Sequence, residues 1–170
     1  MLDRNNNLKP VASEHYRDAM ARLAGAVNIV TTSGASGRRG VTVSAAVSVS
    51  DNPPTILVCL NRNRAENAMF AENGVLALNT LCEDEVDLAR AFAGEGHLAM
   101  EQRFAMGEWY GLSTGSPILR GARMALDCVV RDVQAVATHW VIMAEVVAVA
   151  PFNDDPALLY IDRAYHSLEK

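Results

Sequence analysis

Hydrophobic and polar residues alternate along the segment from Val41 to Ser50. Its odd positions are Val or Ala, and four of its even positions carry hydroxyl groups. Because successive side chains of a strand point to opposite faces, the pattern predicts a strand with an aliphatic row on one face and Thr42, Ser44, Ser48 and Ser50 on the other. Such a strand would span on the order of 30 Å, which is unusually long, so we expect a bend or a bulge within it.

The remaining pattern predicts further strands and a few helices. A helix is expected after Ser13, because Tyr16, Met20 and Leu23 recur at helical spacing and Gly25 follows as a helix C-terminal residue. Strands are expected at 26–32, 55–60, 74–81, 124–136 and 139–150, and a last segment at 160–168 closes the chain. Short helices are expected up to Phe70 and over 83–92. Residues 94–123 are weakly periodic and are predicted to form a long ordered loop.

These elements indicate a mainly β, α+β fold. Strands dominate, and hairpin-length connections such as Ser33–Gly37 join several of them, which is typical of an antiparallel sheet. A small antiparallel β-barrel with peripheral helices therefore fits better than a parallel α/β sheet. Residues 1–12 are predicted to be a polar N-terminal arm, and residues 13–170 a single domain, because the sequence shows no repeat and no interdomain linker.

Composition narrows the classes of function. Half of the 170 residues are hydrophobic, which allows a substantial core, and 15 Lys and Arg against 20 Asp and Glu leave a net charge of −5. A negative charge disfavours nucleic acid as a partner, and the uncharged stretches are too short to span a membrane. Cys59, Cys82 and Cys128 lie in apolar runs, which predicts reduced thiols and a cytoplasmic location. The four histidines lack metal-ligand spacing, so no metal site is expected.

Two segments suggest a binding site for a small molecule. The hydroxyl row carries no Lys, Glu or Arg, so it is either a solvent face or a surface for a flat polar ligand. Residues Asn61, Arg62, Asn63 and Arg64 come after a buried strand and before a helix, where backbone N–H groups and guanidinium groups can hold a phosphate, although an ordinary charged turn would look the same. Together they predict one ligand, with a planar head on the hydroxyl row and an anionic tail at the Arg62 turn.

Two short motifs and one histidine are further candidates for a functional role. Residues Gly111–Gly115 match G-x-S-x-G, but the strand and helix required around a nucleophilic serine are missing. Residues Gly94–Ala99 match G-x-G-x-x-A, but they follow a helical pattern where a dinucleotide fingerprint follows a strand, which favours a helix exit. His139 is the histidine most suggestive of function, because it is a polar ring at the start of an otherwise apolar strand.

The order of several motifs resembles that of the flavin reductase-like proteins, which have an FMN-binding split barrel. The resemblance covers nearly the whole chain, and it is carried by Tyr16–Met20, Gly40–Ala45, Val47–Asp51, Pro53–Pro54, Leu60–Arg62, Arg103–Phe104, Trp109, Thr114–Leu119, Thr138–His139 and Tyr160–His166. Each motif is weak alone, but their order is specific. The family includes the small reductase components of two-component flavin-dependent monooxygenases, such as the 4-hydroxyphenylacetate hydroxylase system.

The resemblance implies a homodimer of antiparallel split β-barrels that reduces FMN, or FAD, with NADH, or NADPH, and passes the reduced flavin to a separate flavin-dependent oxygenase. It implies a set of flavin-binding residues, namely Thr42, Ser44, Ala45, Ser48, Val49, Ser50, Leu60, Asn61, Arg62, Asn63, Arg64, Arg103 and Phe104. On the nicotinamide side it implies His139, Arg163, Tyr165 and His166. His139 is expected to be the catalytic residue, orienting the nicotinamide over the flavin.

The chain departs from the family pattern at two places. Ala137 replaces the glycine that usually precedes Thr-His, and Asn63 and Arg64 stand where small hydroxyl residues are common. The second departure implies a more basic phosphate site that favours FMN. The alternatives are a flavin or haem carrier without enzymatic activity, a structural dimer without a ligand, and an activity like that of pyridoxamine-phosphate oxidases, which fold analogy alone suggests.

Overall fold

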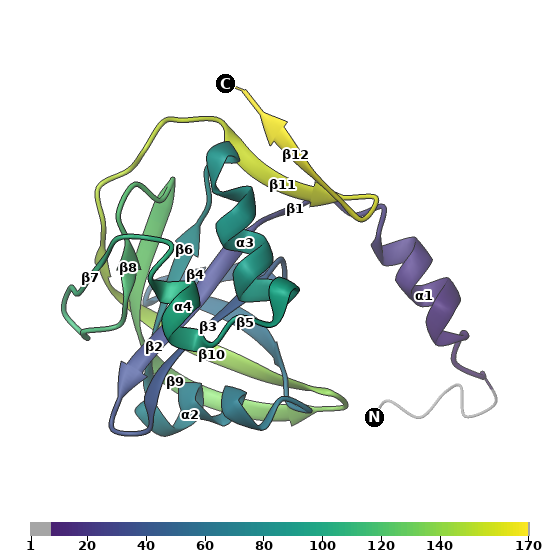
Figure 1. Ribbon diagram of the computed structural model, residues 1–170. Helices are drawn as coiled ribbons and strands as arrows, with labels where there is room; N and C mark the ends of the chain where they lie inside the picture. Colours follow the sequence, from purple (N-terminus) through teal and green to yellow (C-terminus); the bar gives the residue numbers. More distant parts are fainter. Residues whose placement is uncertain (1–7, 170) are drawn as a thin grey trace.

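The main sheet of the computed structural model, which describes residues 8–169, has seven antiparallel strands in the order β3-β2-β6-β9-β10-β5-β4 (Figure 1). The strands are β2 (Asn28–Gly34), β3 (Gly37–Val43), β4 (Ala46–Asp51), β5 (Pro54–Asn61), β6 (Val75–Thr80), β9 (Met124–Val136) and β10 (His139–Val149). A long hairpin of β9 and β10 forms its centre. The predicted mainly β, antiparallel fold is confirmed.

The alternating segment is divided between the two edges of this sheet. β3 ends at Val43 and β4 begins at Ala46, so that only Ser44 and Ala45 connect one edge strand to the other. Because two residues span only about 7 Å, the sheet curls until its edges approach each other, although β3 and β4 do not pair. The expected bend is therefore confirmed, and a further register shift occurs in β4 between Ser48 and Ser50. The result is a barrel with an open seam.

A second sheet and several short elements complete the fold. β1 (Gly25–Ala26), β11 (Ala157–Ile161) and β12 (Ala164–Leu168) form a sheet at one end, and β7 (Trp109–Tyr110) pairs with β8 (Ile118–Leu119). The helices are α1 (Ser13–Met20), α2 (Met69–Asn73), α3 (Val86–Ala93) and α4 (Met100–Phe104), with 3-10 turns η1 (Ala65–Ala68), η2 (Glu83–Glu85) and η3 (Glu95–His97).

Two predictions about local structure were wrong. Gly25 is a strand residue and not a helix C-terminus, because α1 ends at Met20; an added Cβ there would lie 3.2 Å from that of Ser44, so glycine permits this close approach. Residues 94–123 contain η3, α4, β7 and β8, which are too short to produce a periodic pattern. The segment at 160–168, for which no element type was predicted, contains a hairpin turn, at which Asp162 and Arg163 adopt positive φ.

Two hydrophobic clusters occupy opposite faces of the sheet. Val30, Leu76 and Leu78 point into the barrel, whereas Ile29 and Ala77, their neighbours in sequence, point to the side covered by α3 and α4. On that side the rings of Phe92, Phe104 and Trp109 stack edge to face, with centroids 5.0 to 5.7 Å apart. Gly40 is essential to this packing, because an added Cβ would lie 2.3 Å from the Phe92 ring.

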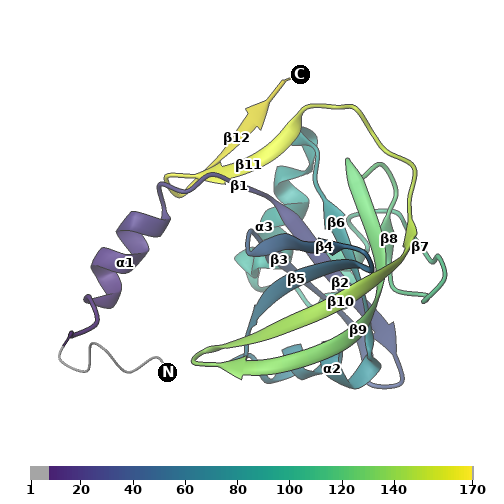
Figure 2. The same cartoon turned by 180° about the vertical axis from the view of Figure 1, so that it is seen from behind.

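Helix α1 projects away from the barrel (Figures 1 and 2), and none of its residues is buried. Residues 1–7 of the expected N-terminal arm lie outside the described residues, and residues 8–12 are exposed. Within residues 8–169, each helix is too short or too polar to cross a lipid bilayer.

Candidate functional site

A cleft of about 540 Å³ lies at the open seam of the barrel. β5 continues three residues past the end of its pairing with β4, so Cys59, Leu60 and Asn61 face β3 across the seam. Ser44 and Ala45 close one end, where the Cys59 N–H donates a hydrogen bond of 3.0 Å to the Ala45 carbonyl. The lining residues are Arg39, Val41, Thr42, Val43, Ser44, Ala45, Cys59, Leu60, Asn61, Arg64, Glu66, Asn67, Phe92, Ala93, Gly94, His97, Arg103 and His139. We call this space the seam cleft.

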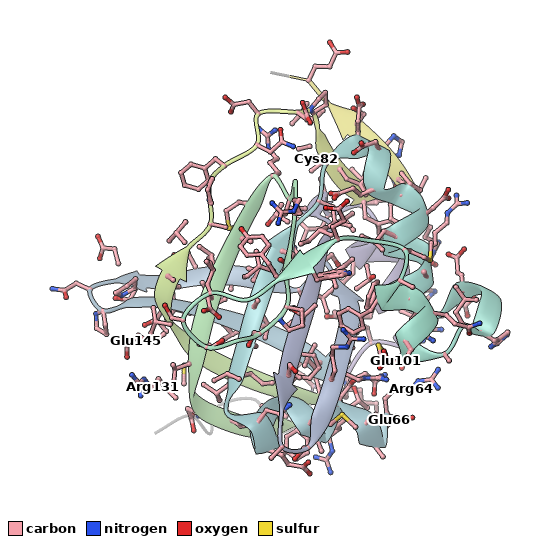
Figure 3. The ribbon with its side chains drawn as sticks, turned by 60° about the vertical axis from the view of Figure 1, so that its left-hand side comes forward. Arg64, Glu66, Cys82, Glu101, Arg131 and Glu145 are labelled. Atoms are coloured by element: carbon pink, nitrogen blue, oxygen red, sulfur yellow. The ribbon has the colours of Figure 1, made fainter. Side chains whose placement is uncertain are left out.

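Three guanidinium groups, those of Arg39, Arg64 and Arg103, give the seam cleft its charge. Arg39 donates to the Asn67 side-chain oxygen at 3.0 Å, and Arg103 donates to the Leu98 carbonyl at 2.9 Å. Burial lowers the pKa of Arg39 from its usual value; Glu66 opposes the shift, and Arg103 and Arg64 add to it. Figure 3 shows Arg64 and Glu66 at the same edge of the molecule. Positive charge concentrated around a cleft favours an anionic ligand.

The four hydroxyls of the alternating segment do not form a continuous face. Thr42 and Ser44 line the seam cleft, whereas Ser48 and Ser50, together with Val49, belong to β4 and are not among its lining residues. The Thr42 hydroxyl donates to the Ala89 carbonyl at 2.7 Å and so holds α3 against β3. The Ser50 hydroxyl accepts a hydrogen bond of 3.1 Å from the Asn52 N–H. Ser44 is exposed and available to a ligand.

The turn after β5 separates two arginines that the sequence placed together. The Asn63 N–H donates to the Asn61 side-chain oxygen at 2.9 Å, and the turn sends Arg64 into the seam cleft. The guanidinium carbon of Arg62 lies 5.5 Å from the ring centroid of Trp140, outside the cleft. Asn63 also lies outside its lining, and the buried Phe104 belongs to the hydrophobic core under α3.

His139 enters the seam cleft from β10, where it is opposite Asn61 of β5. Its Nδ1 lies 2.9 Å from the Thr138 hydroxyl oxygen, which holds the ring by a hydrogen bond. The Thr138 carbonyl accepts a 3.0 Å hydrogen bond from the Arg62 N–H, which ties the β9–β10 turn to the turn after β5. Ala137 in this turn has φ of 47°, in the left-handed region that favours glycine, so the alanine occupies a conformation to which the glycine of the family pattern is better suited.

A second cleft of about 820 Å³ adjoins the first, and the two share Thr42, Val43, Ser44 and Ala93. Its other lining residues are Val27, Val86, Arg90, Glu95, Tyr160, Arg163, Ala164 and Tyr165. It lies between α3 and the hairpin of β11 and β12, and we call it the hairpin cleft. Arg163 and Tyr165 are therefore brought together, while the exposed His166, the next residue along β12, lines neither cleft.

Several lining residues were missed in the sequence. Arg39 precedes the alternating segment on the same strand, and Asn67 follows the Arg62 turn, so their positions in sequence were suggestive. Asn67 is buried, and its amide donates to the Asn61 carbonyl at 2.8 Å, which fixes the turn. Glu66 and His97 gave no signal, because their approach depends on how η1 and η3 pack against the barrel. Within residues 8–169, no group of three or more His, Cys, Asp or Glu side chains is arranged to hold a metal ion.

Comparison with known proteins places this geometry in a wider context. The model of the "Flavin reductase like domain" family matches residues 20–169. The chain is 48% identical over 158 residues to the FMN reductase (NADH) RutF of Pantoea ananatis, covering 93% of this chain and 82% of that protein. A solved structure classed as a flavin reductase, from Haemophilus somnus, superposes with a TM-score of 0.88 at 42% identity, covering 93% of this chain and all of that one. BorF, the flavin reductase component of a bacterial two-component tryptophan halogenase, gives a TM-score of 0.86 at 25% identity, covering 94% and 99%.

Proposed function

The chain belongs to the flavin reductase-like domain family, and we propose that it is a flavin reductase that reduces FMN with NADH. This is the activity named for the Pantoea ananatis relative, which is similar over nearly the whole chain. The observation that carries the proposal within this structure is the seam cleft, where Arg39, Arg64 and Arg103 surround one space with Ser44 and His139.

The residues of the seam cleft fit FMN. Val41, Val43 and Cys59, which are partly exposed, provide apolar surface for a flat ring system, and Ser44, Ala45 and Asn61 provide polar groups for its edge. The three guanidinium groups can neutralise the terminal phosphate, which carries nearly two negative charges near neutral pH. Arg64 is one of the positions that departs from the family pattern, and its place in the cleft supports FMN as the flavin.

When bound, the flavin ring accepts a hydride from the reduced nicotinamide. The protein's contribution is to bind and orient the two ring systems. Thr42, Val43 and Ser44 line both clefts, so the hairpin cleft can hold the pyridine nucleotide beside the seam cleft, with Tyr165 on its far side. His139, fixed by the Thr138 hydroxyl, is in position to orient the nicotinamide.

The test of this function is NADH oxidation, followed as loss of absorbance at 340 nm, with FMN, FAD and riboflavin compared side by side. We expect FMN to give the highest kcat/KM, because it ends in a phosphate that the guanidinium groups can bind. Riboflavin has no phosphate, and the phosphates of FAD are joined to an adenosine. A protein that binds FMN tightly without oxidising NADH would instead be a flavin carrier. Absence of both flavin binding and flavin-dependent thermal stabilisation would contradict the proposal.

The role of His139 has its own test. His139→Ala is expected to lower kcat/KM for NADH roughly 10-fold or more, because the nicotinamide loses an orienting contact. The dissociation constant of FMN should change less, since the guanidinium groups and the Ser44 segment remain. An unchanged kcat/KM for NADH would remove His139 from the site.

The proposed activity implies a consumer of reduced flavin. BorF is the reductase component of a two-component enzyme, and we propose that this protein likewise supplies a separate flavin-dependent oxygenase. Release is compatible with the geometry, because Arg64, His97 and His139 are all exposed at the cleft. Coupled assays in which reduced FMN must diffuse across a dialysis membrane to an oxygenase would establish whether the flavin leaves the protein between turnovers.

We also propose that the protein is a homodimer. The outer face of β4 and β10 exposes large aliphatic side chains, and among residues 8–169 no helix covers this side of the barrel (Figure 2). The residues concerned are Val47, Val49, Val147 and Val149. Helix α1 and the turn that follows it add an exposed apolar set of Tyr16, Met20 and Leu23 on an arm that projects from the molecule. A second copy could cover both, because a symmetric interface matches the same surfaces of two identical chains.

The proposed location is the cytoplasm. Cys59, Cys82 and Cys128 are free thiols, and the last two are buried in the core. Cysteines kept in this state are typical of a reducing compartment. Fractionation of cells that express the tagged protein would contradict this location if the protein were found outside the cytoplasmic fraction.

A further inference from the structure

Within the described chain, Glu95 is the single carboxylate among the residues that line the hairpin cleft. It follows α3, in the segment Gly94–His97, which has no part in the proposed function so far. The other charged lining residues are Arg90 and Arg163. A ligand in this cleft therefore meets one acidic group, and its position and partners decide which ligands are accepted.

The backbone conformation of this segment places some of its residues in the seam cleft and Glu95 in the hairpin cleft. Gly94, Gly96 and His97 have φ of 103°, 71° and 52°, and all three values lie in the left-handed region. Gly94 and His97 line the seam cleft, whereas Glu95 between them lines the hairpin cleft. Holding a histidine in this conformation costs energy, which other contacts must offset, and such strain is concentrated at functional sites. The segment thus forms a wall between the two clefts.

Glu95 belongs to a cluster with Arg90 and Tyr165. The Arg90 Nε lies 3.9 Å from the Glu95 Oε2, and the Arg90 guanidinium carbon lies 5.7 Å from the centre of the Tyr165 ring. Burial raises the pKa of Tyr165, Glu95 adds to this shift, and Arg90 opposes it. The Tyr165 ring also stacks edge to face on Tyr160, with centroids 5.1 Å apart. The aromatic rings of Tyr160 and Tyr165 therefore lie beside Arg90, and the charge of Arg90 is already paired with Glu95.

Arg163, the other guanidinium of the cleft, is also engaged. Its Nη2 lies 2.5 Å from the Oδ1 of Asp18, on helix α1. The hairpin cleft therefore offers aromatic rings, one carboxylate and two arginines that each have an acidic partner. This is a poor environment for an additional phosphate group, because Glu95 would repel it and Arg90 would have to leave its carboxylate.

We propose that Glu95 makes the enzyme select NADH over NADPH, an inference that rests on the proposed function and on the hairpin cleft holding the pyridine nucleotide. The carboxylate accepts hydrogen bonds from the 2′- and 3′-hydroxyls of the adenosine ribose in NADH. In NADPH the 2′-hydroxyl is replaced by a phosphate, which removes a donor and places negative charge beside Glu95. Carboxylates and arginines discriminate between these nucleotides by the same chemistry in other dinucleotide sites.

Glu95→Gln tests the proposal. The variant removes the repulsion and frees Arg90 to meet the 2′-phosphate, so the ratio of kcat/KM for NADPH to that for NADH is expected to rise roughly 10- to 100-fold. Arg90→Gln in addition to Glu95→Gln should abolish most of this gain. Glu108→Gln is the matched control, since Glu108 pairs with Arg120 at 3.2 Å and lines neither cleft. The control should leave the ratio unchanged.

A binding measurement separates nucleotide selection from turnover. Calorimetric titration of the FMN-loaded protein with 5′-AMP and with 2′-AMP should show a preference for 5′-AMP in the wild type and a shift toward 2′-AMP in Glu95→Gln. The shift should weaken at high salt, because the phosphate interaction is electrostatic. Equal affinity for the two probes in the wild type, or an unchanged preference in Glu95→Gln, would overturn the proposal.

The proposed function and the proposed role of Glu95 can be contradicted separately. If the wild type oxidises neither nucleotide with any flavin, the proposed function is wrong, and the titrations still report whether Glu95 selects the ligand of the hairpin cleft. If the wild type oxidises NADH but uses NADPH equally well, the function stands and the role of Glu95 is wrong. The same conclusion follows if Glu95→Gln changes both nucleotides by one factor.

Discussion

The two arginines of the turn after β5 illustrate how individual side chains define the site. Arg62 and Arg64 are separated by one residue, yet Arg62 rests on the Trp140 ring and Arg64 lines the seam cleft with Arg39 and Arg103. An arginine on an aromatic face contributes packing and a cation–π interaction. An arginine at a cleft is available to an anion. The structure thus favours Arg64 as the residue of this turn that meets the flavin phosphate.

Arg64→Ala is expected to raise the dissociation constant of FMN roughly 10- to 100-fold, because a charge-assisted hydrogen bond to phosphate is lost. Riboflavin, which lacks the phosphate, should be affected less than about twofold if the ring contacts are unaffected. Arg62→Ala is the matched comparison and should treat the two flavins alike. Fluorescence titration with both flavins measures these constants. The reverse pattern, with a phosphate-specific loss in Arg62→Ala alone, would return the phosphate to Arg62.

Among the elements, α3 connects the core to both clefts. It packs on β3 through Gly40, whose missing side chain admits the Phe92 ring, and through the hydrogen bond from Thr42 to Ala89. Its start is preceded by η2, where the Glu85 carboxylate accepts a 2.7 Å hydrogen bond from the Cys82 N–H. Burial raises the pKa of Glu85 to about 7; the hydrogen bond from Cys82 opposes the shift, and Asp84 and Asp155 add to it.

The shifted pKa predicts a pH-dependent stability. The ordinary pKa of this carboxyl is 4.5 and its folded pKa is about 7, so the folded state binds the proton more tightly than the unfolded state. Stability from this group is therefore fully present below pH 4.5 and is lost as the pH rises through about 7.

Glu85→Gln keeps an acceptor for the Cys82 N–H and removes the buried charge. Its Tm should exceed that of the wild type by a few degrees at pH 8, and the difference should vanish near pH 4.5. Thermal unfolding of both proteins across this range is the measurement. Asp87→Asn removes a charge from an exposed carboxylate that does not contribute to the Glu85 shift and is the control. A Tm difference that is the same at every pH would show that Glu85 is not the titrating group.

In the whole molecule, the helices cover one side of the sheet and leave the outer face of β4 and β10 exposed (Figures 1 and 2). The side chains of Val47, Val49 and Val149 are 57%, 50% and 52% exposed. Large aliphatic side chains gathered on one exposed face are characteristic of a protein interface. The same barrel that forms the seam cleft on one edge thus offers a surface for a second copy.

Val47→Asp is expected to convert the proposed dimer into a monomer, because two-fold symmetry would bury two unpaired carboxylates in one interface. Light scattering coupled to size-exclusion chromatography measures the mass. Met106→Asp is the control, since Met106 is 46% exposed and lines a separate groove beside α3. A wild type of monomeric mass would contradict the dimer, and a dimeric Val47→Asp would place the interface elsewhere.

The local pattern was sufficient for the longer elements. The alternation at 41–50 depends only on the period of a strand, and it predicted both the strand and the need for a break. The apolar runs that became β5, β9 and β10 are long enough to be recognised in the same way. η3, β7 and β8 are too short to show a period, and contacts such as the Trp109 stack on Phe92 and Phe104 hold them in place.

The sequence alone determined that the strands of a barrel carry a row of hydroxyl side chains and are followed by an Asn-Arg turn. It could do so because residue type and spacing are local properties. Only the tertiary structure decided which of these groups share a cleft. Closing the barrel sends Ser44 and Ser48 to different surroundings, turns Arg64 inward and Arg62 onto Trp140, and brings Arg39, Arg103 and Glu95 from distant parts of the chain. These contacts between distant residues depend on how the sheet curls and where the helices pack. A local sequence pattern carries no information about either.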